Sequence, residues 1–226
     1  MNSIRPIKTV FCAAPNLPIP FESVCRYLGL GNSKPDSQLA ALVERSIGEF
    51  RTAARFAACY VVAPVMAADG GVNFGGLTAP GKSLAKHLAG CDQAILFAAT
   101  AGMETERQRK RASVTSPVQA LALDAVGTAA IESFCDWLCG KWAEEFPGSA
   151  LRPRFSPGYG DLPLEMQKPL LALLEANRNA GISLTDALLM VPQKSVSAVV
   201  GIGKTGCTAK TPDCVACDKR DCEFRL

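Results

Sequence analysis

The apolar residues of the chain recur mainly at helical spacing, and this pattern predicts two long helices, at residues 36–57 and 116–145. Asp36 precedes the first and can cap it. Ser116 and Pro117 begin the second, where serine is a good cap and proline is favoured in the first turn. Both helices are long enough to present an extended apolar face to a core.

Shorter segments complete the predicted secondary structure. Short helices are expected at residues 21–28, 81–88, 104–111, 164–177 and 185–190. Apolar or β-rich runs predict strands at residues 60–62, 72–77, 93–99 and 195–202. Thr185 would cap the last short helix, and the rest of residues 1–33 is expected to be irregular. Because helices and strands do not alternate regularly, we expect an α+β domain at residues 1–203, with an antiparallel or mixed sheet flanked by long helices, and a short tail at 204–226.

The composition of the chain limits the classes of protein to which it can belong. The chain has 226 residues, of which 48% are hydrophobic and 20% charged, as in an ordinary globular protein. Its net charge of +3 is too small to indicate nucleic-acid binding. The N-terminus lacks a secretory pattern, and Pro64 interrupts the apolar run at residues 57–68, so that no membrane span is expected and the predicted location is cytoplasmic.

Residues 152–163 combine three prolines and two glycines and cannot form a helix. The segment carries a fixed cation at Arg154, a hydroxyl at Ser156 and an aromatic ring at Tyr159. A guanidinium offers a planar fork that matches a carboxylate, and a tyrosine ring offers a flat apolar face. These groups suit a small zwitterion that carries a flat ring, although an ordinary surface loop is an equal alternative on the residues alone.

The ten cysteines fall into two groups. Six are scattered and are read as small buried apolar residues. The other four follow the spacing C-x6-C-x2-C-x4-C in the last twenty residues, at Cys207, Cys214, Cys217 and Cys222. Thiolates in this pattern suit a four-iron four-sulfur cluster or structural zinc, and spacing does not choose between them. The absence of metal is the third alternative.

Other candidate signals are weaker. The chain has a single histidine, His87, with no nucleophile in a recognisable motif, so that catalysis with histidine as base is not expected. Gly203 and Lys204 resemble the end of a phosphate-binding loop, but Ala198 stands where that loop needs its first glycine. Glu132 and Asp136 lie one helical turn apart, which is usual for a solvated face, and one of them could face a ligand.

Several blocks of the chain resemble the activation domain of cobalamin-dependent methionine synthase, and they occur in the same order. The most specific is Arg-x-x-x-Gly-Tyr, formed here by Arg154, Gly158 and Tyr159, which is similar to the S-adenosylmethionine-binding motif of that family. Further similar blocks lie at residues 96–102, 123–132, 190–192 and 195–197. The chain has no Asp-x-His-x-x-Gly cobalt-ligand motif, so that it resembles a short, free-standing form of the domain.

The resemblance implies roles for the residues of this loop. Arg154 would pair with the methionine carboxylate of the ligand, and Ser156 and Gly158 would bring backbone groups close to it. Tyr159 would pack on the ligand or on the corrin ring. The fused enzymes have alanine at the position of Ser156.

Outside the loop the correspondence is looser. The ligand-binding acid of the long helix could fall at Thr128 or at Glu132. Ser197 belongs to the closing segment, in which Val200 stands where the fused enzymes have a ligand-contacting tyrosine. The N-terminal region offers no convincing counterpart of the family's ligand-binding aspartate.

The function implied by the resemblance is reductive reactivation. S-adenosylmethionine and one electron would restore methylcobalamin from cob(II)alamin on a separate cobalamin-carrying methionine synthase core, so that the chain would be an accessory part of a methyltransferase activity. The partner would supply the cobalamin, a flavodoxin or ferredoxin-type donor would supply the electron, and the cysteine tail would pass that electron on. The alternative is a metal-stapled docking or electron-transfer accessory protein for another corrinoid methyltransferase, which would not bind S-adenosylmethionine.

Overall fold

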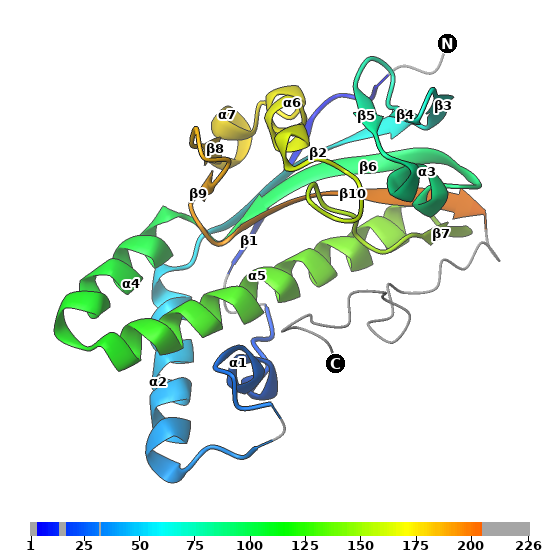
Figure 1. The fold of residues 1–226 in the computed structure, drawn as a ribbon. Coiled ribbons are helices and arrows are strands. Elements are labelled where there is room, and N and C mark those ends of the chain that lie inside the picture. The colour runs from blue at the N-terminus through cyan, green and yellow to red at the C-terminus, as the bar shows by residue number, and fades with distance from the viewer. Residues whose placement is uncertain (1–3, 14–16, 32, 205–226) are drawn as a thin grey trace.

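The computed structural model describes residues 4–13, 17–31 and 33–204, and it shows an antiparallel sheet between two layers of helices (Figure 1). The strand order is β1-β2-β6-β10-β7, and every neighbouring pair is antiparallel. These strands are Lys8–Cys12 (β1), Phe56–Pro64 (β2), Cys91–Thr100 (β6), Ser149–Leu151 (β7) and Ser195–Lys204 (β10). The α+β class and the sheet flanked by helices, as predicted from the sequence, are confirmed.

The three central strands are buried on both faces, so that the sheet separates two hydrophobic cores. Successive side chains of a strand point to opposite faces. Tyr60 of β2 and Phe97 of β6 accordingly belong to the core on one side, and Val61 and Leu96 to the core on the other. This burial explains why β2 and β6 read as nearly continuous apolar runs rather than alternating ones.

On the first face of the sheet, the long helix Pro117–Glu145 (α5) packs against the strands. The helices Phe21–Tyr27 (α1), Ser37–Ala53 (α2) and Met103–Thr115 (α4) pack against α5. The predicted start of α5 is confirmed, because the Ser116 hydroxyl oxygen accepts from the Gln119 amide at 3.3 Å. Near the other end, Trp142 is buried, and its ring centroid lies 5.3 Å from that of Tyr60 and 5.0 Å from that of Phe97.

By length and composition alone, α5 could also cross a membrane, contrary to the expectation that no segment would qualify. Of its most apolar stretch, 61% is buried inside the protein, where it packs on the sheet. A buried core helix passes the same test of length and composition. The sequence predicts this segment as a helix, and its apolar stretch, which acidic residues such as Asp124 and Glu132 interrupt, meets the criterion as a core helix does.

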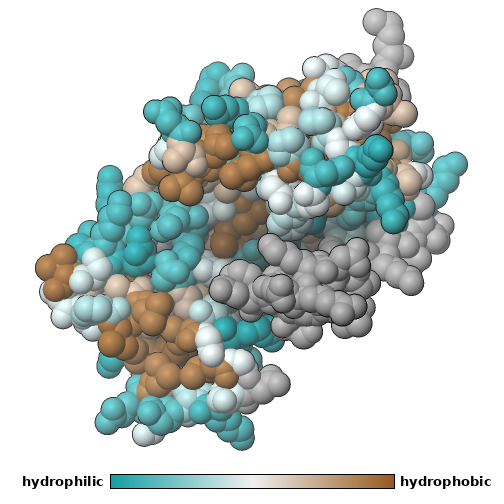
Figure 2. Space-filling model, in the orientation of Figure 1, coloured by the Kyte–Doolittle hydropathy of each residue, from teal (hydrophilic) through white to brown (hydrophobic). Residues whose placement is uncertain are grey.

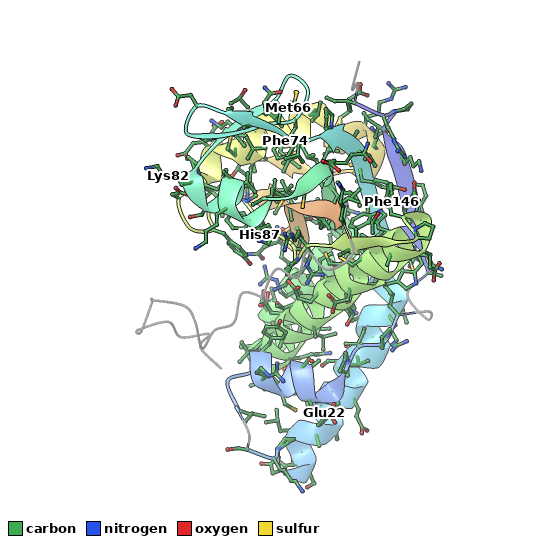
Figure 3. The ribbon with its side chains drawn as sticks, turned by 90° about the vertical axis from the view of Figure 1, so that its right-hand side faces the viewer. Glu22, Met66, Phe74, Lys82, His87 and Phe146 are labelled. Atoms are coloured by element: carbon green, nitrogen blue, oxygen red, sulfur yellow. The ribbon has the colours of Figure 1, made fainter. Side chains whose placement is uncertain are left out.

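The second face is covered by short elements. They are a small antiparallel sheet, Met66–Ala68 (β3), Gly71–Asn73 (β4) and Thr78–Pro80 (β5), with the helices Lys82–His87 (α3), Gln167–Leu173 (α6) and Ala176–Ala180 (α7). Figure 3 separates the two layers, with buried Phe74 among these elements and Glu22 of α1 at the far end of the helical layer.

Five predicted elements are corrected by the structure. The strand expected at residues 72–77 is instead the end of β4 and the turn that connects it to β5. Residues 8–12 form β1 rather than an irregular segment, and α2 ends at Ala53, because Phe56 already begins β2. The helix predicted at residues 164–177 is divided into a turn of 3-10 helix, α6 and α7, with Glu175 in a left-handed conformation between them. The segment predicted as a helix at 185–190 is instead the loop of a hairpin between Ser183–Leu184 (β8) and Met190–Val191 (β9).

The exposed surface includes apolar side chains at the connection between α4 and α5, where Figure 2 shows brown residues. Val114, Val118 and Leu121 lie there, and each is more than half exposed. Val114 lies at the end of α4 and the other two at the start of α5, whereas the site described below lies along the second half of α5.

Candidate functional site

The Pro/Gly stretch after β7 continues along β10 as a short extended edge. The Arg152 amide donates to the Gly201 carbonyl oxygen at 2.8 Å, and Phe155 and Val199 exchange both backbone hydrogen bonds at 2.9 Å. Because side chains of an extended segment alternate, Arg154 points to the α5 side, while Phe155 packs with the core on the other side. The stretch therefore holds Arg154 on a fixed backbone.

The stretch turns sharply directly after this edge. The Tyr159 amide donates to the Ser156 carbonyl oxygen at 3.0 Å, which closes a β-turn with Pro157 and Gly158 at its centre. Gly158 has φ +92°, and a type II turn requires a positive φ at this position. A Cβ atom there would meet only Leu164, at 3.5 Å, so that the conformation and not the space requires glycine. The Gly158 amide itself donates to the Leu162 carbonyl at 2.9 Å.

Arg154 is held by two carboxylates of α5. Its Nη2 lies 2.7 Å from Glu132 Oε2, and its Nη1 lies 2.7 Å from Asp136 Oδ1. Burial by itself lowers the pKa of Arg154, but the negative charges of Glu132 and Asp136 oppose this effect and the pKa is raised. The guanidinium thus stays a fixed cation between two acids, of which Asp136 is the more exposed, at 74% of its side chain against 41% for Glu132.

A cavity of about 680 Å³ lies against this cation. Its lining includes the predicted site residues Glu132, Arg154, Ser156, Tyr159 and Ser197, whereas Gly158 shapes the turn and does not line it. Figure 2 shows the recess that lies between α6 and α5. The volume falls within the range usual for pockets that bind a small organic ligand.

The two alternative positions for the acid are distinguished by the geometry. Glu132 lines the cavity and contacts Arg154, whereas the Thr128 hydroxyl accepts from Lys194 Nζ at 2.8 Å. Val200 is fully buried in the core between the sheet and α5, so that it offers no contact to the cavity.

One wall of the cavity is an open edge of β10. β7 and the loop cover this edge only from Val199 onward, and Ser195 and Ser197 line the cavity beyond that point. Since Val199 directs both backbone groups to the loop, those of Ser197, two residues earlier, point the same way. The Ser197 hydroxyl is also buried, and within the described residues it has no hydrogen-bond partner. Buried polar groups normally have partners, so that this wall is suited to a polar ligand.

Two contacts join the loop to α3. His87 lies at one end of this helix and Lys82 at the other (Figure 3), and the His87 ring nitrogen donates to the Pro153 carbonyl at 2.8 Å. The Asp161 carboxylate accepts from the Lys82 and Ser83 amides at 2.8 and 2.9 Å and so caps α3. These hydrogen bonds lower the pKa of Asp161, whereas burial lowers the pKa of His87.

His87 also starts a row of three rings that positions Tyr159. Its ring centroid lies 5.1 Å from that of Phe155, which in turn meets the Tyr159 ring edge-on at 5.9 Å. Tyr159 is 55% exposed beside the cavity. The only histidine of the chain therefore supports the loop.

Three residues near the cavity were missed by the sequence analysis or left undecided. Asp136 holds one arm of Arg154, Gln167 lines the cavity from the start of α6, and Tyr27 of α1 lies close enough for Glu132 to affect its pKa, which burial raises. A glutamine at a helix start and a tyrosine in a short N-terminal helix carry no motif, so that no sequence signal could have found them.

The predicted metal ligands Cys207, Cys214, Cys217 and Cys222 lie outside the described residues. Within the part of the chain that the structure describes, no group of three or more histidine, cysteine or acidic side chains is placed to hold a metal ion. The six scattered cysteines all lie within it as free thiols, four of them buried, as expected for small apolar residues.

A family model described as vitamin B12 dependent methionine synthase, activation domain, matches residues 84–206, which is more than half of the chain. The crystal structure of the MetH reactivation domain bound to AdoHcy is similar, with a TM-score of 0.65 and 13% identity over 91% of this chain and 80% of that one. At this identity the likeness shows the fold alone. A search of curated proteins found no match.

Proposed function

The chain belongs to the family of vitamin B12-dependent methionine synthase activation domains, and we propose that it binds S-adenosylmethionine in the cavity beside Arg154. The observation that carries this proposal is the placement of the Arg154 guanidinium, which the loop backbone and two α5 carboxylates fix at the wall of a cavity of suitable volume. AdoHcy, the ligand of the similar MetH structure, differs from S-adenosylmethionine by one methyl group.

The residues present fit the two ends of the amino-acid part of this ligand. Arg154 would bind the carboxylate through its planar fork, and Glu132, 2.7 Å from the same guanidinium, would bind the ammonium group. A paired cation and anion at this spacing match a zwitterion and would reject a ligand that carries only one of the two charges.

The adenosyl part would lie along the open edge of β10. Ser197 offers its backbone groups and a buried hydroxyl without a partner, and Ser156 and Tyr159 form the adjacent wall. Tyr159 presents a ring face on which a flat base can stack. In this assignment Gly158 acts through the turn that places Ser156 and Tyr159.

The chemistry that the bound ligand supplies is an electrophilic methyl group on a sulfonium centre. The residues of this chain would bind and orient that ligand at the surface, toward a partner. Orientation of this kind is a recognised source of rate acceleration. No proton has to move, which fits a site built from arginine, acids, serine and tyrosine, in which the single histidine supports the loop.

The proposed partner is a separate cobalamin-carrying methionine synthase core, with a flavodoxin or ferredoxin-type electron donor, and the proposed location is cytoplasmic. We further propose that the four C-terminal cysteines hold an iron–sulfur cluster or zinc, on the basis of their spacing. Iron with acid-labile sulfide in anaerobically purified protein is the expected result for a cluster. Zinc without iron would contradict an electron-transfer role for this tail.

Calorimetric titration with S-adenosylhomocysteine tests the proposed function. We expect saturable binding that Arg154→Ala weakens by roughly tenfold to a hundredfold, because it removes hydrogen bonds to a charged group. Arg107→Ala is the matched control, since Arg107 is an exposed cation that pairs with Glu104 on α4 and does not line the cavity. Absence of binding by the unchanged protein would overturn the proposal and favour an accessory protein that does not use this ligand.

A further inference from the structure

Gln167 is a buried polar residue for which the fold gives no internal reason. It is the first residue of α6, its side chain lines the cavity, and the residue is only 7% exposed. Its carbonyl oxygen Oε1 is inaccessible to water and accepts no hydrogen bond within the described residues. A buried amide oxygen without a partner is unfavourable, and such groups are few in folded proteins. A ligand in the cavity can supply the missing donor.

The position of Gln167 within the cavity indicates which part of the ligand it would meet. Arg154 and Glu132 lie on the α5 side of the sheet, whereas α6 packs on the opposite side. Between them runs the open edge of β10 with the unpartnered hydroxyl of Ser197. A ligand whose amino-acid end is held by Arg154 therefore extends along this edge toward Gln167 with its other end, the base.

We infer that Gln167 recognises the adenine base of the ligand. A glutamine amide carries an acceptor next to a donor, and adenine presents the complementary pair, an exocyclic amine next to a ring nitrogen. Oε1 accepts from the amine, and Nε2 donates to the ring nitrogen. At the N6/N7 edge of the base, a carbonyl oxygen in place of the amine leaves two acceptors side by side, so that the glutamine amide in either orientation keeps at most one of the two hydrogen bonds. This inference rests on the proposed binding of S-adenosylmethionine.

If Gln167 binds the base, a substitution at this position should lower the affinity for the ligand without lowering the stability of the protein. Gln167→Met keeps the length of the side chain and removes both polar atoms, so that no unpartnered acceptor stays buried. The variant is expected to unfold at a temperature no lower than the unchanged protein, while its affinity for an adenosyl ligand falls. A residue with a purely structural role would show the reverse, with lower stability and unchanged preference between bases.

The test compares S-adenosylhomocysteine with S-inosylhomocysteine, which differ in the base. We expect the unchanged protein to bind the adenosyl ligand roughly tenfold more tightly or better. In Gln167→Met the ratio of the two dissociation constants should approach one. Gln108→Met is the matched control, because Gln108 of α4 also has a buried Oε1 without a partner but does not line the cavity.

The outcomes distinguish this inference from the proposed function. Arg154→Ala should weaken both ligands equally and keep their ratio. If adenosyl binding depends on Arg154 but Gln167→Met leaves the preference between the two bases unchanged, only the inferred role of Gln167 is overturned. Equal affinity of the unchanged protein for both ligands overturns it without any variant. Failure of the unchanged protein to bind either ligand overturns the proposed function and this inference together.

Discussion

The Nη1 atom of Arg154 lies 2.7 Å from Asp136 Oδ1, so that the outer arm of the guanidinium fork is already engaged by an acid of the same domain. The inner arm is engaged by Glu132 at the same distance. A ligand carboxylate that uses the fork must take over at least one of these arms. Asp136, with 74% of its side chain exposed, is the partner that can return to water at lower cost.

Asp136→Asn is therefore expected to tighten ligand binding. The substitution removes a competing negative charge, whereas the exposed ion pair that it breaks contributes little to stability. We expect the affinity for S-adenosylhomocysteine to rise about twofold to fivefold, as measured by calorimetry. Glu144→Gln on the same helix is the control, because Glu144 pairs with exposed Lys141 and does not line the cavity. Weaker binding by Asp136→Asn would show instead that Asp136 contacts the ligand directly.

Glu132→Gln is expected to act in the opposite direction. This acid lines the cavity and would pair with the ligand ammonium group, so that its neutralisation should weaken binding roughly tenfold. A deaminated ligand that lacks the ammonium group should bind the variant and the unchanged protein about equally. If Glu132→Gln and Asp136→Asn changed the affinity in the same direction, the two acids would have to be assigned the same role.

Gly158→Ala tests the turn that presents Ser156 and Tyr159. The position has φ +92°, and a side chain there is strained whatever the surrounding space, so that the free energy of unfolding should fall by about 1–3 kcal/mol. Gly140→Ala is the control, because Gly140 lies within α5 with open space around it and should gain roughly 0.5–1 kcal/mol. Urea denaturation measures both. An unchanged stability of Gly158→Ala would mean that the turn rearranges.

The sequence predicted best the elements with local signals. Helix α5 begins where Ser116 and Pro117 place its cap, and β6 and β10 follow their apolar runs closely. Strand β1 was missed because it is an edge strand with exposed side chains, which pairing with β2 stabilises, and no local pattern marks such a strand.

At residues 183–191 the same local sequence signal is compatible with a short helix and with the hairpin that the structure shows. The sequence predicts Thr185 as a helix cap. Its hydroxyl does accept from a backbone amide, but from that of Leu189 in a turn. Six residues are too few for helical periodicity to decide between the two. No glycine or proline marks the break at Glu175, so that the sequence predicts α6 and α7 as one helix.

The candidate site could be predicted only where a motif is contiguous. Arg154, Ser156 and Tyr159 lie in one stretch, and Glu132 was among the two positions considered. The contact between Asp136 and Arg154 joins residues 18 positions apart, and the position of Gln167 at the cavity depends on the packing of α6. Such relationships arise from tertiary structure and leave no pattern in the sequence.

We expect the stability of the protein to depend on pH through His87, which supports the loop that carries Arg154. Burial lowers the pKa of His87 below its ordinary value of 6.5, although the hydrogen bond to Pro153 opposes this shift. The unfolded chain then binds more protons than the folded protein below pH 6.5. The contribution of His87 to stability is therefore fully present above pH 6.5 and is lost as the pH falls toward the lowered pKa.

Two measurements test this pH dependence. The histidine signal needs no separate assignment, because His87 is the only histidine of the chain. The imidazole proton resonance should titrate with a midpoint below 6.5. The free energy of unfolding, followed between pH 5.5 and 7.5, should decline toward acid in the unchanged protein and stay flat in His87→Gln, which keeps a donor for Pro153 but does not titrate. The acids with lowered pKa values, Glu104, Glu106, Glu145 and Asp161, titrate below this window. If the free energy of unfolding changed with pH in the same way in both proteins, the pKa of His87 would have its ordinary value. Protonation of His87 would then not destabilise the loop.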